Sequence, residues 1–293
     1  MESSVLTAVI LPLALFAIML GMGLGLTIQD FQRIFVYPKG VAIGLLAQLV
    51  MLPCVGIILA SVFPLSPELA VGVAIIAACP GGPTSNLVTY LGRGNVALSI
   101  TLTAISSLIT VFTIPLVVNV SMQRFLGATT DLQLPFSTTV LQIAVITFIP
   151  VTLGMAMRRY APKVAASIES WVKWLSLFFL ALIIVGLLIK ERANVVGFFL
   201  QVGWVTFALL VITMALGYGI AKLAKIDDPS ATAITVEVGI QNGTLAIAVA
   251  SAPTFLNNPT MAIPAAIYSL LMFVGCGVFA WWSQKQLSQV PAS

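Results

Sequence analysis

Apolar residues fill nine stretches of the chain, and each approaches or exceeds the roughly 20 residues that a helix needs to cross a bilayer. Short polar segments separate these stretches. The predicted crossings cover residues 6–26, 40–62, 67–92, 96–120, 136–157, 172–189, 196–221, 229–252 and 260–283. The pattern predicts an all-α polytopic membrane protein with nine transmembrane helices, in which residues 1–293 form a single membrane domain.

The third and eighth predicted helices are each interrupted by a polar segment that contains glycine. The first break reads CPGGPTSN (residues 79–86), and the second reads EVGIQNGT (residues 237–244). PELAVGVAIIAACPGG, from Pro67, aligns with PSATAITVEVGIQNGT, from Pro229, because both open with proline and run about a dozen residues to a break. The third and eighth crossings would run in opposite directions. Crossings two to four and seven to nine are therefore predicted to be inverted repeats that carry two discontinuous helices, an arrangement typical of transporters.

Basic residues are unequally shared between the two sides of the predicted membrane. One side holds Arg33, Lys39, Arg93, Arg158, Arg159, Lys163, Lys173, Lys222, Lys225 and Lys285, whereas the other holds Arg124, Lys190 and Arg192. Lysine and arginine are enriched in cytoplasmic loops. The distribution predicts a multi-pass protein of the plasma membrane (the inner membrane in a bacterium), with its N-terminus outside and its C-terminus in the cytoplasm.

Composition narrows the function classes. Hydrophobic residues make up 60% of the chain and charged residues 8%, whereas soluble domains are about one quarter charged. The formal net charge of +4 is scattered over loops, so no nucleic-acid partner is expected, and no feature indicates an obligatory protein partner. Histidine is absent, and no paired carboxylate lies within a predicted span. Since an enzyme would then lack its usual acid and base, the chain is not expected to be an enzyme.

The N-terminal segment, the glycines near residue 23 and the cysteines are expected to have structural roles. Glu2 and the absence of Lys or Arg before the first apolar run favour a retained first helix over a cleavable signal. Gly21, Gly23 and Gly25 are expected to allow close helix packing rather than to bind a nucleotide. The three cysteines are expected to be small buried hydrophobic residues, at positions Cys54, Cys79 and Cys276.

Glu237 is the one acidic residue of nine that lies deep in a predicted span. An intramembrane carboxylate costs roughly 2.5 to 3.5 kcal/mol on insertion scales and therefore needs a partner. No Lys or Arg lies at a comparable depth. The partner is then a proton, a hydrogen-bond network or a bound cation. A hard cation such as Na⁺ would find oxygen ligands nearby, on the side chains of Gln48, Ser85, Asn86, Ser99 and Thr103.

The two breaks also offer a site for an anion. Thr84, Ser85 and Asn86 are expected to cap a half-helix after the first break, and Gly243 and Thr244 to open another after the second. Helix N-termini attract negative charge. The segments predict a cation beside Glu237 and an anionic substrate at the two helix starts.

Other interpretations of these residues stay open. The first break could be a proline kink without a ligand. The Ser99 and Thr103 hydroxyls could bond back to carbonyls of their own helix. Glu237 could be a protonated structural acid or a proton carrier, and a channel could use the same half-helices to line its pore.

The two breaks resemble the signature segments of the bile acid:sodium symporter family. CPGGPTSNLVTYLGRGNVALS and ITVEVGIQNG look like those segments, and LGMGLGLTIQDF (Leu20 to Phe31) is similar to the family's early helix-end motif. The resemblance extends over essentially the whole chain. It implies an NhaA-like core that carries two crossed, broken helices and moves against a panel. The core would comprise approximately residues 40–120 and 196–284, and the panel approximately residues 1–39 and 121–195.

The resemblance also implies the site residues. Two Na⁺ sites are expected, the first formed by Ser85, Asn86, Ser99, Thr103 and Glu237, and the second by Gln48, Glu237, Val238, Ile240 and Gln241. Substrate binding is expected at Pro83, Thr84, Asn242, Gly243 and Thr244.

The function implied is secondary active, Na⁺-coupled symport of an organic anion by alternating access. The alternative is a proton-coupled or passive organic anion transporter or channel. Pro83-Thr84, Leu271 and Met272 depart from the family's pattern on the substrate side. The substrate is accordingly a bile-acid-like molecule or a smaller carboxylate.

Overall fold

A computed structural model describes residues 9–127, 134–190 and 195–288, and within these ranges every regular element is a helix. Arg192, one of the residues behind the predicted orientation, lies outside them, as do the first residues of the first predicted crossing. The helices are α1 (Leu11–Gly25), α2 (Ile28–Gln32), η2 (Arg33–Phe35), α3 (Pro38–Leu46), η3 (Ala47–Met51), α4 (Leu52–Val62), α5 (Pro67–Ala78), α6 (Pro83–Leu91), α7 (Val96–Leu126), α8 (Phe136–Tyr160), α9 (Pro162–Lys190), α10 (Val195–Leu223), α11 (Asp228–Gly239), α12 (Gly243–Ser251), η4 (Pro259–Ala262) and α13 (Ile263–Ser288).

The described residues contain six spans long and apolar enough to cross a membrane, or up to eight if each of two bent helix pairs is one span. The bent pairs are α1 with α2 and η2, at 75°, and α5 with α6, at 67°. The helix α9 covers the sixth predicted crossing but is not among these candidates, so the count of nine stays a prediction. The sixth crossing was also expected to begin at residue 172, whereas α9 begins at Pro162. Its first turns carry charged residues that a search for apolar runs excludes.

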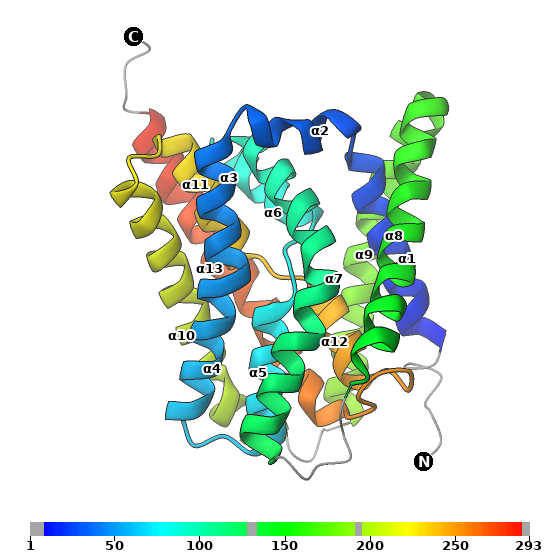
Figure 1. Cartoon of the computed structure of the whole chain (residues 1–293), viewed down its shortest axis with the longest axis vertical. Coiled ribbons are helices and arrows are strands. Elements are labelled where there is room, and N and C mark those ends of the chain that lie inside the picture. Colours follow the sequence, from blue (N-terminus) through cyan, green and yellow to red (C-terminus); the bar gives the residue numbers. More distant parts are fainter. Residues whose placement is uncertain (1–8, 128–133, 191–194, 289–293) are drawn as a thin grey trace.

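The helices form two groups. The first consists of α1, α8 and α9, which pack against one another on the right of Figure 1. The second contains α3 to α7 and α10 to α13, and its helices contact one another extensively. The groups meet where α8 contacts α7 and where α1 contacts α6 and α12. The short helix α2 runs along the upper end of the molecule between the two groups (Figure 1).

Small residues bring α1 and α8 into backbone contact. A Cβ atom on Gly23 would collide with the backbone of Val151, and one on Gly154 would collide with the Leu20 carbonyl. Gly21 likewise packs against Val172 of α9. The predicted role in helix packing is confirmed for Gly21 and Gly23. It is wrong for Gly25, whose Cβ position has no neighbour within 4 Å, because α1 ends there.

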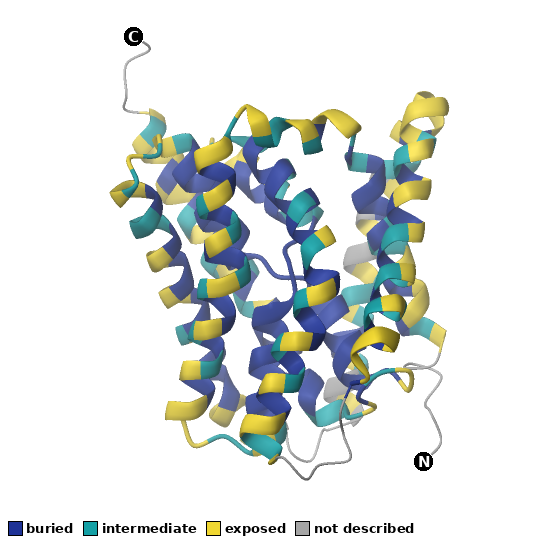
Figure 2. Ribbon diagram, viewed as in Figure 1, coloured by how far each residue is buried: buried dark blue, intermediate teal, exposed yellow. Residues whose placement is uncertain are grey.

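The broken helices are the most buried part of the molecule. Every residue of α11 from Ser230 to Gly239 is buried, as are all of the residues in α12, and so is most of α5. The unwound segments between the half-helices run through the centre of the molecule, where Figure 2 shows them in dark blue. Cys79 and Cys276 are buried as predicted, but Cys54 is exposed on α4.

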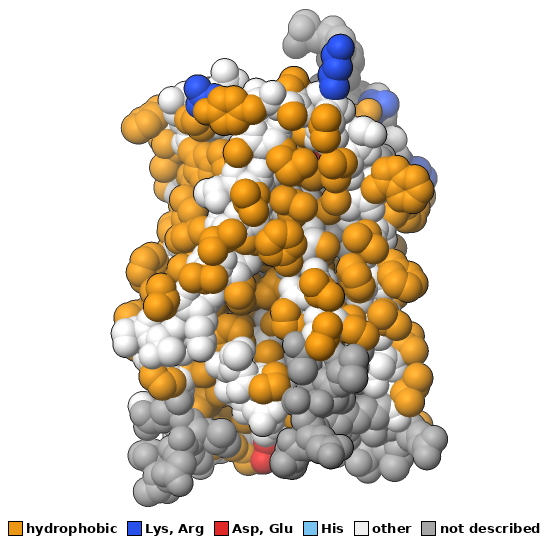
Figure 3. All heavy atoms as spheres, turned by 90° about the vertical axis from the view of Figure 1, so that its right-hand side faces the viewer, with side chains coloured by type: hydrophobic (Ala, Val, Ile, Leu, Met, Phe, Trp, Pro, Cys, Tyr) orange, Lys and Arg blue, Asp and Glu red, His pale blue; other side chains and the backbone are white. Residues whose placement is uncertain are grey.

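The outer surface matches a protein embedded in lipid. Exposed large hydrophobic side chains are spread along the long helices, among them Leu116 and Val120 of α7 and Leu141 and Val145 of α8. On the face drawn in Figure 3, apolar atoms cover the middle, and Lys and Arg atoms gather toward one end. In Figure 1, the turns that join α2 to α3, α8 to α9 and α10 to α11 lie at that same end, with the last turns of α13. These turns carry most of the basic residues assigned above to one side.

We expect Gly154→Ala to lower the free energy of unfolding by about 1 to 3 kcal/mol, because the new methyl group would overlap backbone atoms of α1 that cannot rotate away. The matched control is Gly277→Ala on α13, where no atom lies within 4 Å of the Cβ position. The control should be neutral or stabilising, since alanine favours helix. Thermal unfolding in detergent micelles measures both variants, and equal losses would contradict the close α1–α8 contact.

Candidate functional site

The first break separates α5 from α6 by four residues, Cys79 to Gly82. Gly82 is the N-cap of α6, and Pro83 occupies the first helical position. The prediction that Thr84, Ser85 and Asn86 cap this half-helix is therefore wrong. Proline at the first position lacks only an N–H that the helix would not use, and its fixed φ suits the start of a helix. The Ser85 hydroxyl instead donates to the Gly82 carbonyl at 2.8 Å.

The second break is shorter and capped by a side chain. The helix α11 ends at Gly239, and α12 begins at Gly243, as predicted. Asn242 is the N-cap, and its Oδ1 atom accepts a hydrogen bond from the Leu245 N–H at 2.9 Å. Freed carbonyls within the break also find partners, since the Tyr268 hydroxyl donates to the Gly239 carbonyl at 2.9 Å.

The two breaks touch each other. The Asn242 N–H donates to the Pro80 carbonyl at 2.9 Å, which joins one unwound segment to the other. Gly81 allows this approach, because a Cβ atom there would lie 3.0 Å from both Glu237 Oε1 and the Ile240 carbonyl oxygen. The breaks of the two aligned segments are thus in direct contact with each other.

The Glu237 carboxylate lies beside this contact and is 1% exposed. Its Oε1 atom accepts from the Thr103 hydroxyl at 2.6 Å, and its Oε2 atom accepts from the Ser99 hydroxyl at 3.2 Å. The Ser99 hydroxyl also lies 2.9 Å from Asn86 Oδ1, and the Ser85 hydroxyl lies 3.3 Å from that of Thr103. The side chains of the five residues predicted for the first cation site therefore lie together in one polar cluster.

This cluster decides between two sequence-based interpretations of α7. Ser99 and Thr103 direct their hydroxyls to Glu237 rather than back to their own helix. Thr101, on another face of α7, does bond back to the Ala97 carbonyl at 2.8 Å. Among the ion pairs of the described residues, none brings Lys or Arg within 4.0 Å of Glu237. Its partners are thus neutral oxygens.

Gln48 and Gln241 form a second polar group behind the second break. Gln48 Nε2 donates to Gln241 Oε1 at 2.9 Å, and Gln241 Nε2 donates to the Val238 carbonyl at 2.9 Å. Gln48 is 3% exposed, and its Oε1 atom has no hydrogen-bond partner among the described residues. A buried acceptor without a partner is uncommon and calls for an explanation.

The backbone around Gln48 is irregular as well. Residues Ala47–Met51 form a π-helical turn between α3 and α4. Pro53 follows at the start of α4, where it removes an N–H from the helical ladder. Turns of this kind are frequent at functional sites. The sequence analysis missed the turn, although Pro53 was a signal for it.

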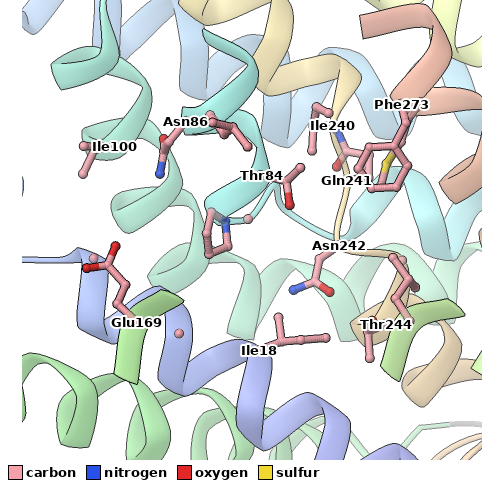
Figure 4. Close-up of a pocket in the computed structure, with 18 residues that line it drawn as sticks. Ile18, Thr84, Asn86, Ile100, Glu169, Ile240, Gln241, Asn242, Thr244 and Phe273 are labelled. Carbon is pink, nitrogen blue, oxygen red and sulfur yellow. The ribbon is translucent and has the colours of Figure 1, made fainter. Parts of the chain in front are cut away.

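A cavity of about 380 Å³ lies on the other side of the two breaks, between the two helix groups. All five predicted substrate-binding residues line it, namely Pro83, Thr84, Asn242, Gly243 and Thr244. Figure 4 shows Thr84 and Asn242 beside the cavity, near Ile18 of α1. The apolar part of the lining includes Ile100, Leu180 and Phe273.

Two residues near these sites were not predicted. Tyr268 of α13 is fully buried and holds the Gly239 carbonyl. Glu169 falls between the fifth and sixth predicted crossings, but it lies within α9 and lines the cavity. A hydroxyl in an apolar run pointed to the first, and nothing in the local sequence pointed to the second.

Comparison with known proteins assigns the family. The profile described as the "Sodium Bile acid symporter family" matches residues 12–198. The chain belongs to this family. It is 33% identical over 273 residues to the uncharacterized sodium-dependent transporter YocS of Bacillus subtilis, an alignment covering 92% of this chain and 81% of that protein.

Two plant proteins are also similar to this chain. The probable chloroplastic sodium/metabolite cotransporter BASS1 of rice (Oryza sativa subsp. japonica) is 31% identical over 252 residues, covering 86% of this chain. The Arabidopsis thaliana BASS1 protein is 31% identical over 275 residues, covering 92%. The chain spans 60% of the rice protein and 66% of the Arabidopsis protein.

We expect Gly81→Ala to lower the free energy of unfolding by about 1 to 3 kcal/mol, because its Cβ would press on the Glu237 carboxylate and the Ile240 carbonyl. Gly82→Ala is the matched control, since no atom lies within 4 Å of that Cβ position. Thermal unfolding of both variants measures the difference. Equal stability of the two would show that the breaks do not meet at Gly81.

Proposed function

We propose that this protein is a secondary active transporter that couples the entry of Na⁺ to the uptake of a small organic anion. The observation that carries the proposal is the Glu237 carboxylate, which is buried among neutral oxygens where two broken helices meet. Membership of the sodium bile acid symporter family supports it, as do the names of its sodium-dependent relatives.

The first Na⁺ would bind among the hydroxyl, amide and carboxylate oxygens of Ser85, Asn86, Ser99, Thr103 and Glu237. An ionised carboxylate inside a bilayer needs a positive partner, and the described residues supply none within 4.0 Å. A hard cation is attracted by oxygen ligands. Since these side chains already lie within hydrogen-bond distance of one another, small rotations would let several face one ion.

The second Na⁺ would bind between Gln48, Gln241, the Glu237 carboxylate and the backbone carbonyls of Val238 and Ile240. The orphaned Oε1 atom of Gln48 supports this proposal, because a cation would satisfy an acceptor that otherwise stays buried and unpaired. The π-helical turn supports it too, since it sets the position of Gln48.

The anion would occupy the cavity at the starts of α6 and α12. Each helix start contributes about half a positive charge, and Thr84, Thr244 and Asn242 add polar side chains to the lining. The volume of about 380 Å³ lies near the lower end of the roughly 300 to 1,000 Å³ that small-molecule sites occupy. A small carboxylate therefore fits better than a steroid-sized molecule.

Alternating access would move the panel against the core. The panel corresponds to α1, α8 and α9, and the core to the remaining long helices; the separation of the two groups along the cavity supports this division. The basic end of the molecule would face the cytoplasm, which would place the start of α1 outside and the end of α13 inside.

We expect Thr103→Val to abolish most of the stabilisation of the purified protein by Na⁺ and to reduce Na⁺-driven uptake at least about tenfold, because a hydrogen bond to a charged group contributes about 1.5 to 3 kcal/mol. Thr101→Val is the matched control, since it removes a buried hydroxyl of α7 that bonds only to its own helix. Thermal unfolding in Na⁺ against K⁺, and uptake of labelled organic anions into proteoliposomes, measure the two effects.

The same assays separate the alternatives. A Thr103→Val variant that keeps its response to Na⁺ would count against the first site. Uptake that follows a proton gradient and ignores Na⁺ would overturn the proposal in favour of proton coupling, and single-channel currents would indicate a channel.

A further inference from the structure

The wall of the cavity lacks a side chain at a position where the structure has room for one. Six of the described glycines have a Cβ position with no atom within 4 Å, namely Gly25, Gly82, Gly127, Gly197, Gly219 and Gly277. All of these except Gly82 are exposed or partly exposed, so the free space beside them needs no explanation. Gly82 is buried and lines the cavity. The free space beside it is therefore part of the cavity.

Neither the backbone nor the packing requires glycine at position 82. Gly82 has φ −146° and ψ −172°, which is an extended conformation that any residue adopts. Gly21 and Gly243 also line the cavity, but a Cβ atom on Gly21 would collide with Val172, and one on Gly243 would collide with the Ser269 hydroxyl. Packing explains those two glycines, whereas it does not explain Gly82.

Helix capping does not require glycine here either. Gly82 is the N-cap of α6 and offers no side-chain oxygen. Asn242 holds the equivalent position of α12, and its Oδ1 atom accepts from the Leu245 N–H at 2.9 Å. Serine, asparagine or aspartate stabilises an N-cap slightly more than glycine does, and the open Cβ position has room for a small side chain. Gly82 thus leaves empty a space that a capping side chain would fill.

This empty space, which we call the Gly82 notch, lies beside the proposed anion site. Gly82 directly precedes Pro83 and Thr84, which line the cavity at the start of α6. Figure 4 shows Thr84 and Asn242 beside the same cavity. Glycine is common where a backbone lies close to a ligand. If a carboxylate is held at the start of α6, the carbon bonded to it lies within reach of the notch.

We propose that Gly82 determines substrate specificity by admitting carboxylates that carry a methyl-sized substituent on the carbon next to the carboxylate. This inference rests on the proposed function. The carboxylate would lie at the starts of α6 and α12, the substituent would fill the Gly82 notch, and the remaining hydrocarbon would pack against Ile18 and Phe273. A side chain at position 82 would occupy the same space and exclude the substituent.

The test uses the full chain in lipid nanodiscs containing Na⁺ and compares isomers of equal mass and charge. The probes are hexanoate, 4-methylpentanoate and the two separate enantiomers of 2-methylpentanoate. Thermal-shift titrations give the apparent affinity of each. The wild type should bind one enantiomer of 2-methylpentanoate about fourfold more tightly than the other three probes, which is the factor that corresponds to burying one methyl group.

Two alanine variants separate the notch from the size of the cavity as a whole. Gly82→Ala should lower the affinity for the preferred enantiomer at least about fourfold relative to hexanoate and remove the discrimination between enantiomers. Gly25→Ala is the matched control, because Gly25 lines the same cavity from α1 and its Cβ position is also free of neighbours. It removes a similar volume from the cavity at another place, so it should keep the wild-type affinity ratios.

Each outcome supports or overturns the inference. It is wrong if Gly82→Ala keeps the wild-type ratios, or if Gly25→Ala changes them as much. It is also wrong if Na⁺ stabilises the wild type but no probe binds, or if hexanoate or 4-methylpentanoate binds best. The wild-type ratios apply even if a variant does not fold, and stabilisation by Na⁺ shows that a variant is folded. If Na⁺ does not stabilise the wild type, the proposed function itself fails, and this inference fails with it.

Discussion

Backbone that leaves the helix inside a bilayer has no water to bond with, so every freed carbonyl and N–H must find a partner within the protein. This constraint governs the centre of the molecule. The two unwound segments meet it partly through each other, by the bond from the Asn242 N–H to the Pro80 carbonyl. Two other freed carbonyls accept hydrogen bonds from side chains: the Gly239 carbonyl from Tyr268, and the Val238 carbonyl from Gln241. The surrounding helices hold these partners in place.

The same constraint makes the centre suitable for ions. Polar atoms that must be present to satisfy the backbone also create a local region of high polarity inside an apolar shell. Glu237 lies in that region, and its carboxylate oxygens accept hydroxyl bonds from α7. Because neutral hydroxyls cannot compensate a full charge, the arrangement is complete only with a cation or a proton. We propose that Na⁺ fills this role, and that its presence allows the neighbouring cavity to accept an anion.

Sequence reasoning found the parts of the site that contrast with their surroundings. Glu237 and the glycine-proline breaks stand out within apolar runs, and Ser99 and Thr103 share one helix face by their spacing. The start of α6 was misjudged, since serine and threonine are good N-caps in general, but Pro83 takes the first helical position and moves the cap to Gly82. The general preference of serine and threonine for the N-cap is overridden here by the preference of Pro83 for the first helical position.

Other features depend on contacts between distant segments. Glu169 sits in a polar part of the sequence, and only the packing of α9 against α1, α8 and α12 brings it to the cavity. The start of α9 was missed for a related reason, because amphipathic turns before an apolar run resemble a loop. Gln48 donates through its Nε2 atom to Gln241, a residue far away in the sequence, and this contact leaves its own Oε1 atom without a partner among the described residues.

The most direct measurement of the central claim is equilibrium binding of radiolabelled sodium to the purified protein, by scintillation proximity. The account predicts saturable binding that unlabelled Na⁺ displaces and K⁺ does not, with two ions per chain and none retained specifically by Glu237→Gln, since that carboxylate contributes to both sites. Absence of saturable binding, or equal binding by the wild type and the variant, would contradict it.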